Sequence, residues 1–322
     1  MADGTRPAST VLMVRDGTDG IEVYLQRRPA AMRFAGGFWV FPGGRVDEAD
    51  RDPAIDTRWM GPPPETWAQA MDVPVDLARG HLVAACREAL EESGILLTSD
   101  SPRADAVAEA RRALLDDDRA MVDVIGDLGV RLDAGLMRYW DWWVTPVSEP
   151  RRYDTRFFVA RLPDAAVVTP HTREVVEEMW ATAADVDTLH VIAPTYYTMR
   201  DALAHPSVDA LLADATRRTV AAVQPTIEDG DIVLPWDERF PLPEGFGDAL
   251  HGWAAARPRR ARVACRTVAV GPPRPVSPCK GALRWRAPSG RRARRAPPSS
   301  SCSSTLCSSS PSPRSPGSCG RT

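Results

Sequence analysis

Residues 87–95, REALEESGI, are the stretch that decides how this sequence folds. Placed on an α-helix at about 100° per residue, the three glutamates share one arc and the opposite face is apolar. That apolar face consists of Leu82, Cys86, Ala89 and Leu90. The pattern predicts an amphipathic helix over residues 82–93, which Gly94 ends as a C-cap.

The three glutamates, Glu88, Glu91 and Glu92, are the candidate metal ligands of the sequence. Their offsets place three carboxylates on one arc, where like charges repel by a few tenths of a kcal/mol per pair. A hard divalent cation such as magnesium prefers oxygen ligands and would remove this repulsion. A lone acidic stretch is more often a solvated helix face, so the neighbouring sequence has to decide between the two interpretations.

A glycine-led loop precedes the acidic helix at a distance. A strand is predicted over residues 38–41, and it ends at Pro42-Gly43-Gly44, where two glycines permit backbone angles that other residues cannot adopt. Upstream, β-branched and aromatic residues predict two strands at 9–14 and 21–26. The turn-forming residues 16–20 between them predict a hairpin.

The rest of the body alternates between strand and helix patterns. Residues 51–80 contain five prolines and no sustained periodicity, so they predict an inserted excursion with one short helix near 66–71. Further helices are predicted at 104–115, at 119–128, at 184–189 and from 194 into the 210s. Further strands are predicted at 138–144, 156–161 and 175–180, and a last hairpin is predicted to turn near 228–231. Strands interrupted by helices indicate an α/β or α+β domain that ends near Gly247.

The charges divide the chain into an acidic body and a basic tail. The 322 residues have a net charge of −3, yet residues 257–322 hold 15 of the 40 basic residues and none of the 43 acidic ones. An acidic body disfavours a nucleic-acid surface, which needs clustered Arg and Lys, and it suits carboxylates gathered around divalent cations.

Residues 257–322 are predicted to form a disordered low-complexity tail. Eleven of the twenty residues from Ser299 to Ser318 are serine, and arginine and proline fill much of the preceding segment. The run Arg291–Arg295 could instead bind an anionic surface, but the composition favours disorder. The expected domains are therefore a folded unit at 1–250 and the tail.

The sequence shows no membrane-spanning segment, no secretory signal and no zinc-binding pattern. No apolar stretch approaches the roughly 20 residues that a membrane helix needs, and no secretory signal is visible, so a cytoplasmic location is expected. Only one of the six cysteines, Cys86, lies in the body, and no zinc pattern results. Each of the five histidines is expected to be a surface or core residue.

The pattern of residues 87–95 behind a glycine-led loop resembles the Nudix box, whose usual form is G-x5-E-x7-REUxEExGU, where U is aliphatic. With Gly44 as the first glycine, Asp50 stands where the family usually has Glu. Between Asp50 and Arg87 there are 36 residues, where the family normally has 7. A split box with Asp at this position resembles the peroxisomal-type acyl-coenzyme A diphosphatases and their bacterial relatives.

A second resemblance lies just upstream of the loop. Coenzyme A-cleaving Nudix enzymes carry a segment LLTxR(S/A)x3Rx3Gx3FPGG, and Arg28, Arg33, Gly37 and residues 41–44 fall at its intervals. The match departs at Tyr24-Leu25-Gln26 in place of LLT and at Pro29 in place of the small residue. Two arginines here could pair with the 3′-phosphate or the diphosphate of coenzyme A. The alternative is that they only balance an acidic surface.

The resemblance implies an α/β/α sandwich with a mixed sheet over about residues 8–245, and a diphosphatase that uses Mg²⁺ or Mn²⁺. It implies that Glu88 and Glu92 are the principal metal ligands, with support from Glu91 and from the Gly44 carbonyl. It also implies that Arg87 orients the glutamates. The candidates for the general base stay open and are Glu88, Glu174, Glu177 and Glu178.

The expected activity is cleavage of coenzyme A or acyl-coenzyme A to 3′,5′-ADP and (acyl-)phosphopantetheine. One alternative is a Nudix pyrophosphatase for ADP-ribose, nucleotide sugars or dinucleoside polyphosphates. Another is a Nudix-fold sensor that binds nucleotide without cleaving it, although a pure binder has no need of three clustered carboxylates. The expected partner is a small-molecule nucleoside diphosphate derivative rather than nucleic acid or a membrane, and a homodimer is left open.

Overall fold

The computed structural model of the protein describes residues 4–32, 35–117, 119–164, 166, 175–228 and 231–235. Arg33, Glu174, the predicted domain end near Gly247 and the predicted tail at 257–322 lie outside the described residues. None of the helices in the described ranges is both long and apolar enough to span a membrane.

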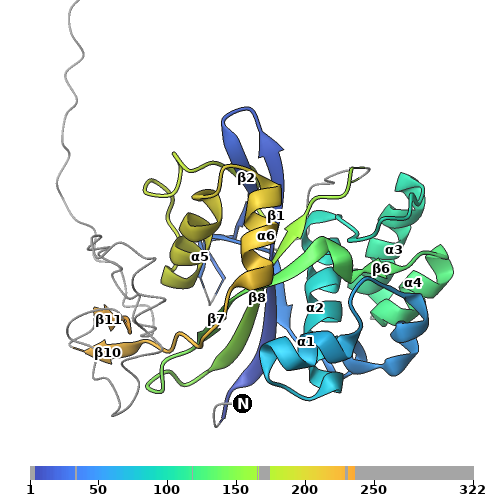
Figure 1. Ribbon diagram of the computed structural model, residues 1–322, viewed down its shortest axis with the longest axis horizontal. Coiled ribbons are helices and arrows are strands. Elements are labelled where there is room, and N and C mark those ends of the chain that lie inside the picture. The colour runs from blue at the N-terminus through green and yellow to red at the C-terminus, as the bar shows by residue number, and fades with distance from the viewer. Residues whose placement is uncertain are drawn as a thin grey trace, which may run out of the picture. The chain divides into compact units, whose positions relative to one another are not determined.

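A mixed seven-stranded sheet forms the centre of the fold (Figure 1). Its strands are β1 (Arg6–Gly17), β2 (Gly20–Arg27), β3 (Trp39–Val40), β4 (Gly43–Arg45), β7 (Met137–Val144), β8 (Tyr153–Arg161) and β9 (Glu177–Ala181). The main order is β3-β2-β1-β8-β7, with β4 paired to β1 and β9 paired to β2. Strands β1 and β8 run parallel, and the other pairs are antiparallel.

Helices cover both faces of the sheet, because its central strands alternate between two apolar faces. On β1, Val11 and Met13 pack against one set of helices, whereas Leu12 and Val14 pack against the other. The first face is covered by α1 (Pro64–Met71), α2 (Val75–Ser93), α3 (Ala104–Asp117) and α4 (Met121–Leu128). The second face is covered by α5 (Ala193–Leu203) and α6 (Val208–Arg217). The predicted α/β/α sandwich is confirmed (Figure 1).

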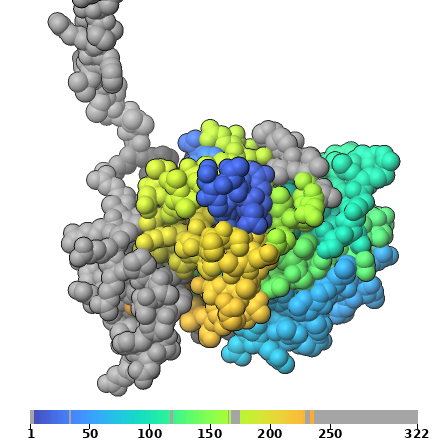
Figure 2. Space-filling model, turned by 45° about the horizontal axis from the view of Figure 1, so that its top comes forward, coloured from blue at the N-terminus to red at the C-terminus, as the bar shows by residue number. Residues whose placement is uncertain are grey.

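The insertion in the box folds as a layer along α2. After η1 (Glu48–Arg51), which carries Asp50, its elements are the 3₁₀ helix η2 (Pro53–Arg58), the strand β5 (Trp59–Met60), which pairs with β6 (Leu132–Asp133), and α1. Arg79 of α2 donates to both carboxylate oxygens of Asp56, at 2.8 and 2.7 Å, and so ties α2 to η2. In Figure 2 the insertion, in light blue, forms a continuous part of the molecular surface.

The start of the acidic helix differs from the prediction. Helix α2 begins at Val75, directly after Pro74, and not at residue 82. Proline is compatible with a helix start because its missing N–H would have no partner there. The two extra turns include the end of the predicted excursion at 51–80, which is helical here, and Arg79 in them pairs with Asp56 of η2, a tertiary contact that is not visible in the local pattern.

Two of the predicted helical segments also differ. The predicted helix at 184–189 is wrong, because the Asp185 side chain accepts from the Thr182 N–H and hydroxyl at 2.8 Å each and closes a turn instead. The long helix predicted from 194 is two helices, and the Ser207 side chain caps the second by accepting from Ala210 N at 3.2 Å. The last hairpin is confirmed as β10 (Thr226–Glu228) and β11 (Asp231–Val233), and η3 (Ala134–Leu136) precedes β7.

Candidate active site

Helix α2 presents the acidic arc because its other side is buried against the sheet. The predicted apolar residues Leu82, Cys86, Ala89 and Leu90 are all at most 1% exposed. Gly94 ends the helix with φ +74°, in the left-handed region that favours glycine, and its N–H bonds to Leu90 O. The predicted faces and the predicted helix end are both present in the structure.

Arg87 lies at the centre of the carboxylates. Its Nε and Nη2 donate to the two oxygens of Asp50 at 3.0 and 3.1 Å. Its Nη1 donates to Glu88 Oε1 at 2.9 Å and to Glu91 Oε2 at 3.1 Å. Charge-assisted pairs of this kind fix side-chain geometry, so Arg87 orients two of the three glutamates.

Asp50 is brought to Arg87 although 36 residues separate them in the sequence. It is 2% exposed, and it also accepts a hydrogen bond from Asp47 N at 2.8 Å, which fixes it on η1. Burial raises the pKa of the Asp50 carboxyl, and the ion pair with Arg87 opposes that rise. The insertion therefore splits the motif in sequence but not in space.

Glu92 is held separately from Arg87, by the strands beneath the helix. It is 6% exposed, and its Oε2 accepts hydrogen bonds from Gly43 N at 3.1 Å and from the Gln26 side-chain amide. The glycines that the sequence predicts to form a loop belong to β4, where Gly43 pairs with Thr10 and Gly44 with Ser9 of β1. The pairing of β4 with β1 places Gly43 where its N–H reaches the Glu92 side chain.

Gly44 packs directly against Glu88. A Cβ atom at Gly44 would lie 2.0 Å from Glu88 Oε1, which is far inside any real contact distance. The close approach of backbone to carboxylate therefore requires glycine at this position. Gly44 thus lies beside Glu88, and the role of its carbonyl as a metal ligand stays a prediction.

Burial and mutual repulsion act on the two enclosed glutamates. Burial raises the pKa of Glu92 well above its ordinary value, and the nearby charge of Glu88 raises that pKa further. Burial also raises the pKa of Glu88, against the lowering effect of Arg87. Two enclosed carboxylates that destabilise each other's charge are stabilised by a cation placed between them.

The donor set suits a divalent cation, although no three Asp, Glu, His or Cys side chains of the described residues surround a common point. Arg87 holds Glu88 and Glu91, so a cation would compete with it for these two ligands. Glu92 is not bonded to Arg87. The carboxylates are the hard oxygen donors that Mg²⁺ and Mn²⁺ prefer. In addition, Gln26 Oε1 is a buried acceptor with no hydrogen-bond partner among the described residues. The residues therefore fit such a cation.

Of the two arginines predicted to bind substrate, Arg28 lies within the described residues. Burial and the charge of Glu88 raise the pKa of Glu92, and the positive charge of Arg28 is one of the effects that oppose this rise. The backbone N–H of Arg28 bonds to Phe38 O at 3.1 Å, a few residues before the glycines at 43 and 44. The other predicted arginine, Arg33, lies outside the described residues.

The candidate bases on β9 face opposite ways. Glu177 is exposed and pairs with Arg27 at 3.0 Å. Glu178 is in register with Gln26 of β2, on the side of the sheet that faces α2, and it accepts from the Tyr24 hydroxyl at 2.6 Å. Of these two glutamates, only Glu178 lies on the helix-facing side with the carboxylate cluster.

Two residues at the site were not predicted from the sequence. Arg111 of α3 donates to the main-chain carbonyls of Glu91 and Glu92, at 2.9 and 3.0 Å, and so caps the last turn of α2. Its position in an amphipathic helix gave no signal of this role. Gln26 did leave a signal, since it is a polar residue in an apolar strand, two positions after the buried Tyr24 on the same face.

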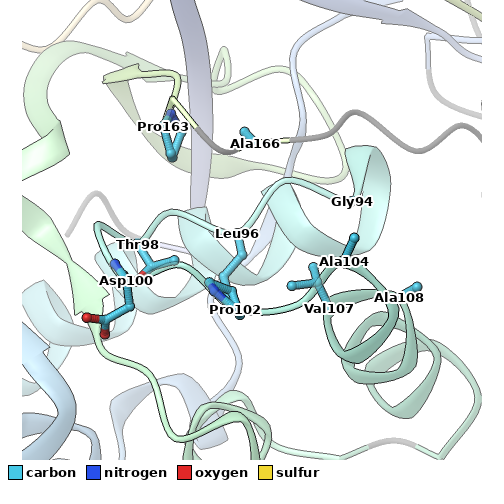
Figure 3. A pocket seen from close by; sticks show the side chains of 10 residues that line it. All are labelled: Gly94, Leu96, Thr98, Asp100, Pro102, Ala104, Val107, Ala108, Pro163 and Ala166. Carbon is cyan, nitrogen blue, oxygen red and sulfur yellow. Dashed lines mark hydrogen bonds between the residues drawn. The ribbon is translucent and has the colours of Figure 1, made fainter.

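A small pocket near the end of α2 is separate from this cluster (Figure 3). Mostly apolar side chains line it, among them Leu96, Pro102, Val107 and Pro163, and none of the clustered carboxylates does. Its volume is about 70 Å³. Sites for drug-sized ligands have about 300 to 1,000 Å³, so this pocket cannot enclose a coenzyme A-sized substrate.

A protein family model and two curated relatives match the body of the chain. Residues 6–198 match the sequence model of a family described as the NUDT19 Nudix domain. The human protein named acyl-coenzyme A diphosphatase NUDT19 is 28% identical over 211 residues, which cover 52% of this chain and 55% of the human protein. A Caenorhabditis elegans protein named nudix hydrolase 7 is 25% identical over 175 residues, which cover 54% of this chain and 50% of that protein. The chain thus spans about half the length of these curated relatives.

A solved structure supports the fold assignment. The crystal structure of a NUDIX hydrolase from Alicyclobacillus acidocaldarius is 27% identical and has a TM-score of 0.52. The match covers 66% of this chain and 97% of that one. The likeness extends over nearly all of the smaller protein and agrees with the layered arrangement described above.

Proposed function

The chain belongs to the Nudix hydrolase family, with a NUDT19 Nudix domain over residues 6–198, and from this membership we propose that it cleaves coenzyme A or acyl-coenzyme A. As a Nudix hydrolase it is a diphosphatase. The reaction adds one water across a P–O–P linkage and yields 3′,5′-ADP and (acyl-)phosphopantetheine. The observation that carries the proposal is the contact between Asp50 and Arg87, which reassembles the split box around Glu88 and Glu91.

The protein's own residues supply orientation and enclosure for this reaction. Arg87 holds Glu88 and Glu91, while Gly43 N and Gln26 hold Glu92. A bound Mg²⁺ or Mn²⁺ would neutralise charge on the diphosphate and make a water more nucleophilic. Cations of this kind are typical of the family, and Glu88, Glu91 and Glu92 are the residues proposed to hold one. The intact set favours a hydrolase over a nucleotide sensor.

Arg28 supports a substrate with an extra phosphate. Coenzyme A differs from its dephospho form by a 3′-phosphate. A positively charged side chain near the diphosphate site would bind this extra phosphate. Arg28 stands at the position of an arginine in the coenzyme A segment, and its positive charge opposes the rise that burial causes in the pKa of Glu92. A guanidinium pairs well with phosphate oxygens because it presents several donors in one plane.

The unmodified enzyme is expected to prefer coenzyme A over dephospho-coenzyme A by about ten- to a hundredfold in kcat/KM, because one charge-assisted contact contributes roughly 1.5 to 3 kcal/mol. Arg28→Ala should lose most of this preference and still cleave the dephospho form. The measurement is kcat/KM on both substrates for the two proteins. Arg103→Ala, which removes an exposed arginine on the surface, is the matched control and should keep the preference.

Two results would move the assignment to the alternative pyrophosphatase activity. One is equal kcat/KM on both substrates in the unmodified enzyme. The other is brisk cleavage of ADP-ribose or a nucleotide sugar with none of coenzyme A. The cytoplasmic location and the open question of a homodimer stay predictions from the sequence.

A further inference from the structure

Gln26 is a buried amide at the point where the sheet meets the acidic helix. It is 1% exposed and lies near the end of β2, in register with Val40 of β3 and Glu178 of β9. A long polar side chain is rarely enclosed in this way unless its groups have partners. The partners of its two amide atoms therefore show what it does.

The nitrogen end of the amide is bound to Glu92. Gln26 Nε2 donates to Glu92 Oε2, and Gly43 N donates to the same oxygen at 3.1 Å. Because both donors reach Oε2, they fix the carboxylate in one orientation and leave Oε1 for a cation. When Glu92 is ionised, as a metal ligand must be, turning the amide over would bring two acceptor oxygens together, so the carboxylate also fixes the orientation of Gln26.

The oxygen end of the amide has no such partner. Gln26 Oε1 is buried and accepts no hydrogen bond from the described residues. An unsatisfied buried acceptor costs about 1 to 3 kcal/mol, and side-chain amide oxygens are suitable ligands for hard cations and acceptors for their waters. Since both amide atoms are attached to one carbon, this oxygen lies beside the Glu92 carboxylate.

We propose that Gln26 is a positioning residue of the metal site: its NH₂ group holds Glu92 in its ligating orientation, and its carbonyl oxygen accepts a hydrogen bond from a water on the bound cation. The inference rests on the proposed metal-dependent function and adds a residue from outside the box. A residue that only filled the core would not need an amide here, because an apolar side chain of equal size would leave no acceptor unsatisfied.

The test is the affinity of the metal-free protein for Mn²⁺, measured by calorimetry without substrate. Gln26→Met keeps the volume and removes both amide groups, and Gln26→Asn keeps the amide but shortens its reach. Both variants are expected to bind Mn²⁺ at least about tenfold more weakly, which corresponds to one lost charge-assisted contact. With substrate, kcat should fall at a fixed Mg²⁺ concentration, whereas KM should stay within about twofold.

The matched control is Thr198→Val, which removes a hydroxyl that donates to Asp141 at 3.0 Å in the core on the other face of the sheet. It should bind Mn²⁺ as the unmodified protein does. If the Gln26 variants fold and bind Mn²⁺ within about twofold of the affinity of the unmodified protein, the positioning role is wrong. If neither variant unfolds cooperatively, the role is also wrong, and Gln26 is a structural residue. If the unmodified protein itself binds no Mn²⁺, the proposed function fails as well.

Discussion

Glu92→Gln is expected to abolish diphosphate hydrolysis while leaving the fold intact. Glu92 is the enclosed glutamate that Arg87 does not hold, so it is the ligand most available to a cation. Loss of one charged ligand to a hard cation should remove several kcal/mol of transition-state stabilisation, or on the order of a thousandfold or more in rate. The measurement is kcat at saturating Mg²⁺, together with the melting temperature of the metal-free protein.

The melting temperature separates the chemical effect from misfolding. Gln is close to Glu in size and keeps an acceptor for the Gly43 N–H, and it removes a buried charge, so the metal-free variant should melt no lower than the unmodified protein. Glu109→Gln, at an exposed position on α3, is the control and should keep full activity. Near-normal turnover by Glu92→Gln with added magnesium would show that the metal site has been assigned to the wrong residues.

Arg87→Met is expected to lower the free energy of unfolding by about 3 to 5 kcal/mol, the cost of leaving a buried charge without its partner. Asp50 is 2% exposed and has Arg87 as its bidentate partner, so the substitution leaves its carboxylate uncompensated. The measurement is urea unfolding of the metal-free protein. Activity should fall too, because Glu88 and Glu91 lose the group that orients them.

A double variant isolates the cost of leaving the Asp50 charge without Arg87. Adding Asp50→Asn to Arg87→Met removes the orphaned charge, so the double variant should be more stable than Arg87→Met alone. The control is Arg131→Met, which breaks a surface pair with Asp100 and should cost less than about 1 kcal/mol. Equal stability losses in Arg87→Met and Arg131→Met would mean that the buried pair does not hold the split box together.

The acidic helix could be predicted from the sequence because its signal is local. The apolar face, the glutamate arc and the end at Gly94 all follow from the helical period and one glycine. The start at Val75 could not be predicted, because the first two turns are stabilised by the ion pair between Arg79 and Asp56 of the insertion. A tertiary contact between two segments does not change the hydrophobic periodicity of either segment, so the sequence pattern does not reveal it.

The site itself could be predicted only in part, for the same reason. The glutamates and Arg87 were found from the motif, and Asp50 was found by counting from Gly44. Asp50 and Arg87 meet across the 36-residue gap because η1 packs against α2. The spacing of residues in the sequence does not predict this packing. Strand β4 was missed because glycines indicate turns, whereas here they permit a close approach to Glu88.

The central claim is metal-dependent cleavage of the diphosphate in coenzyme A, and product analysis of the unmodified protein tests it most directly. Protein freed of metal by EDTA would be incubated with coenzyme A, with and without Mg²⁺, and the products identified by mass spectrometry. We expect 3′,5′-ADP and phosphopantetheine in equal amounts with Mg²⁺, and neither without it. Intact coenzyme A in the presence of Mg²⁺ or Mn²⁺, or equal cleavage in EDTA, would contradict the claim.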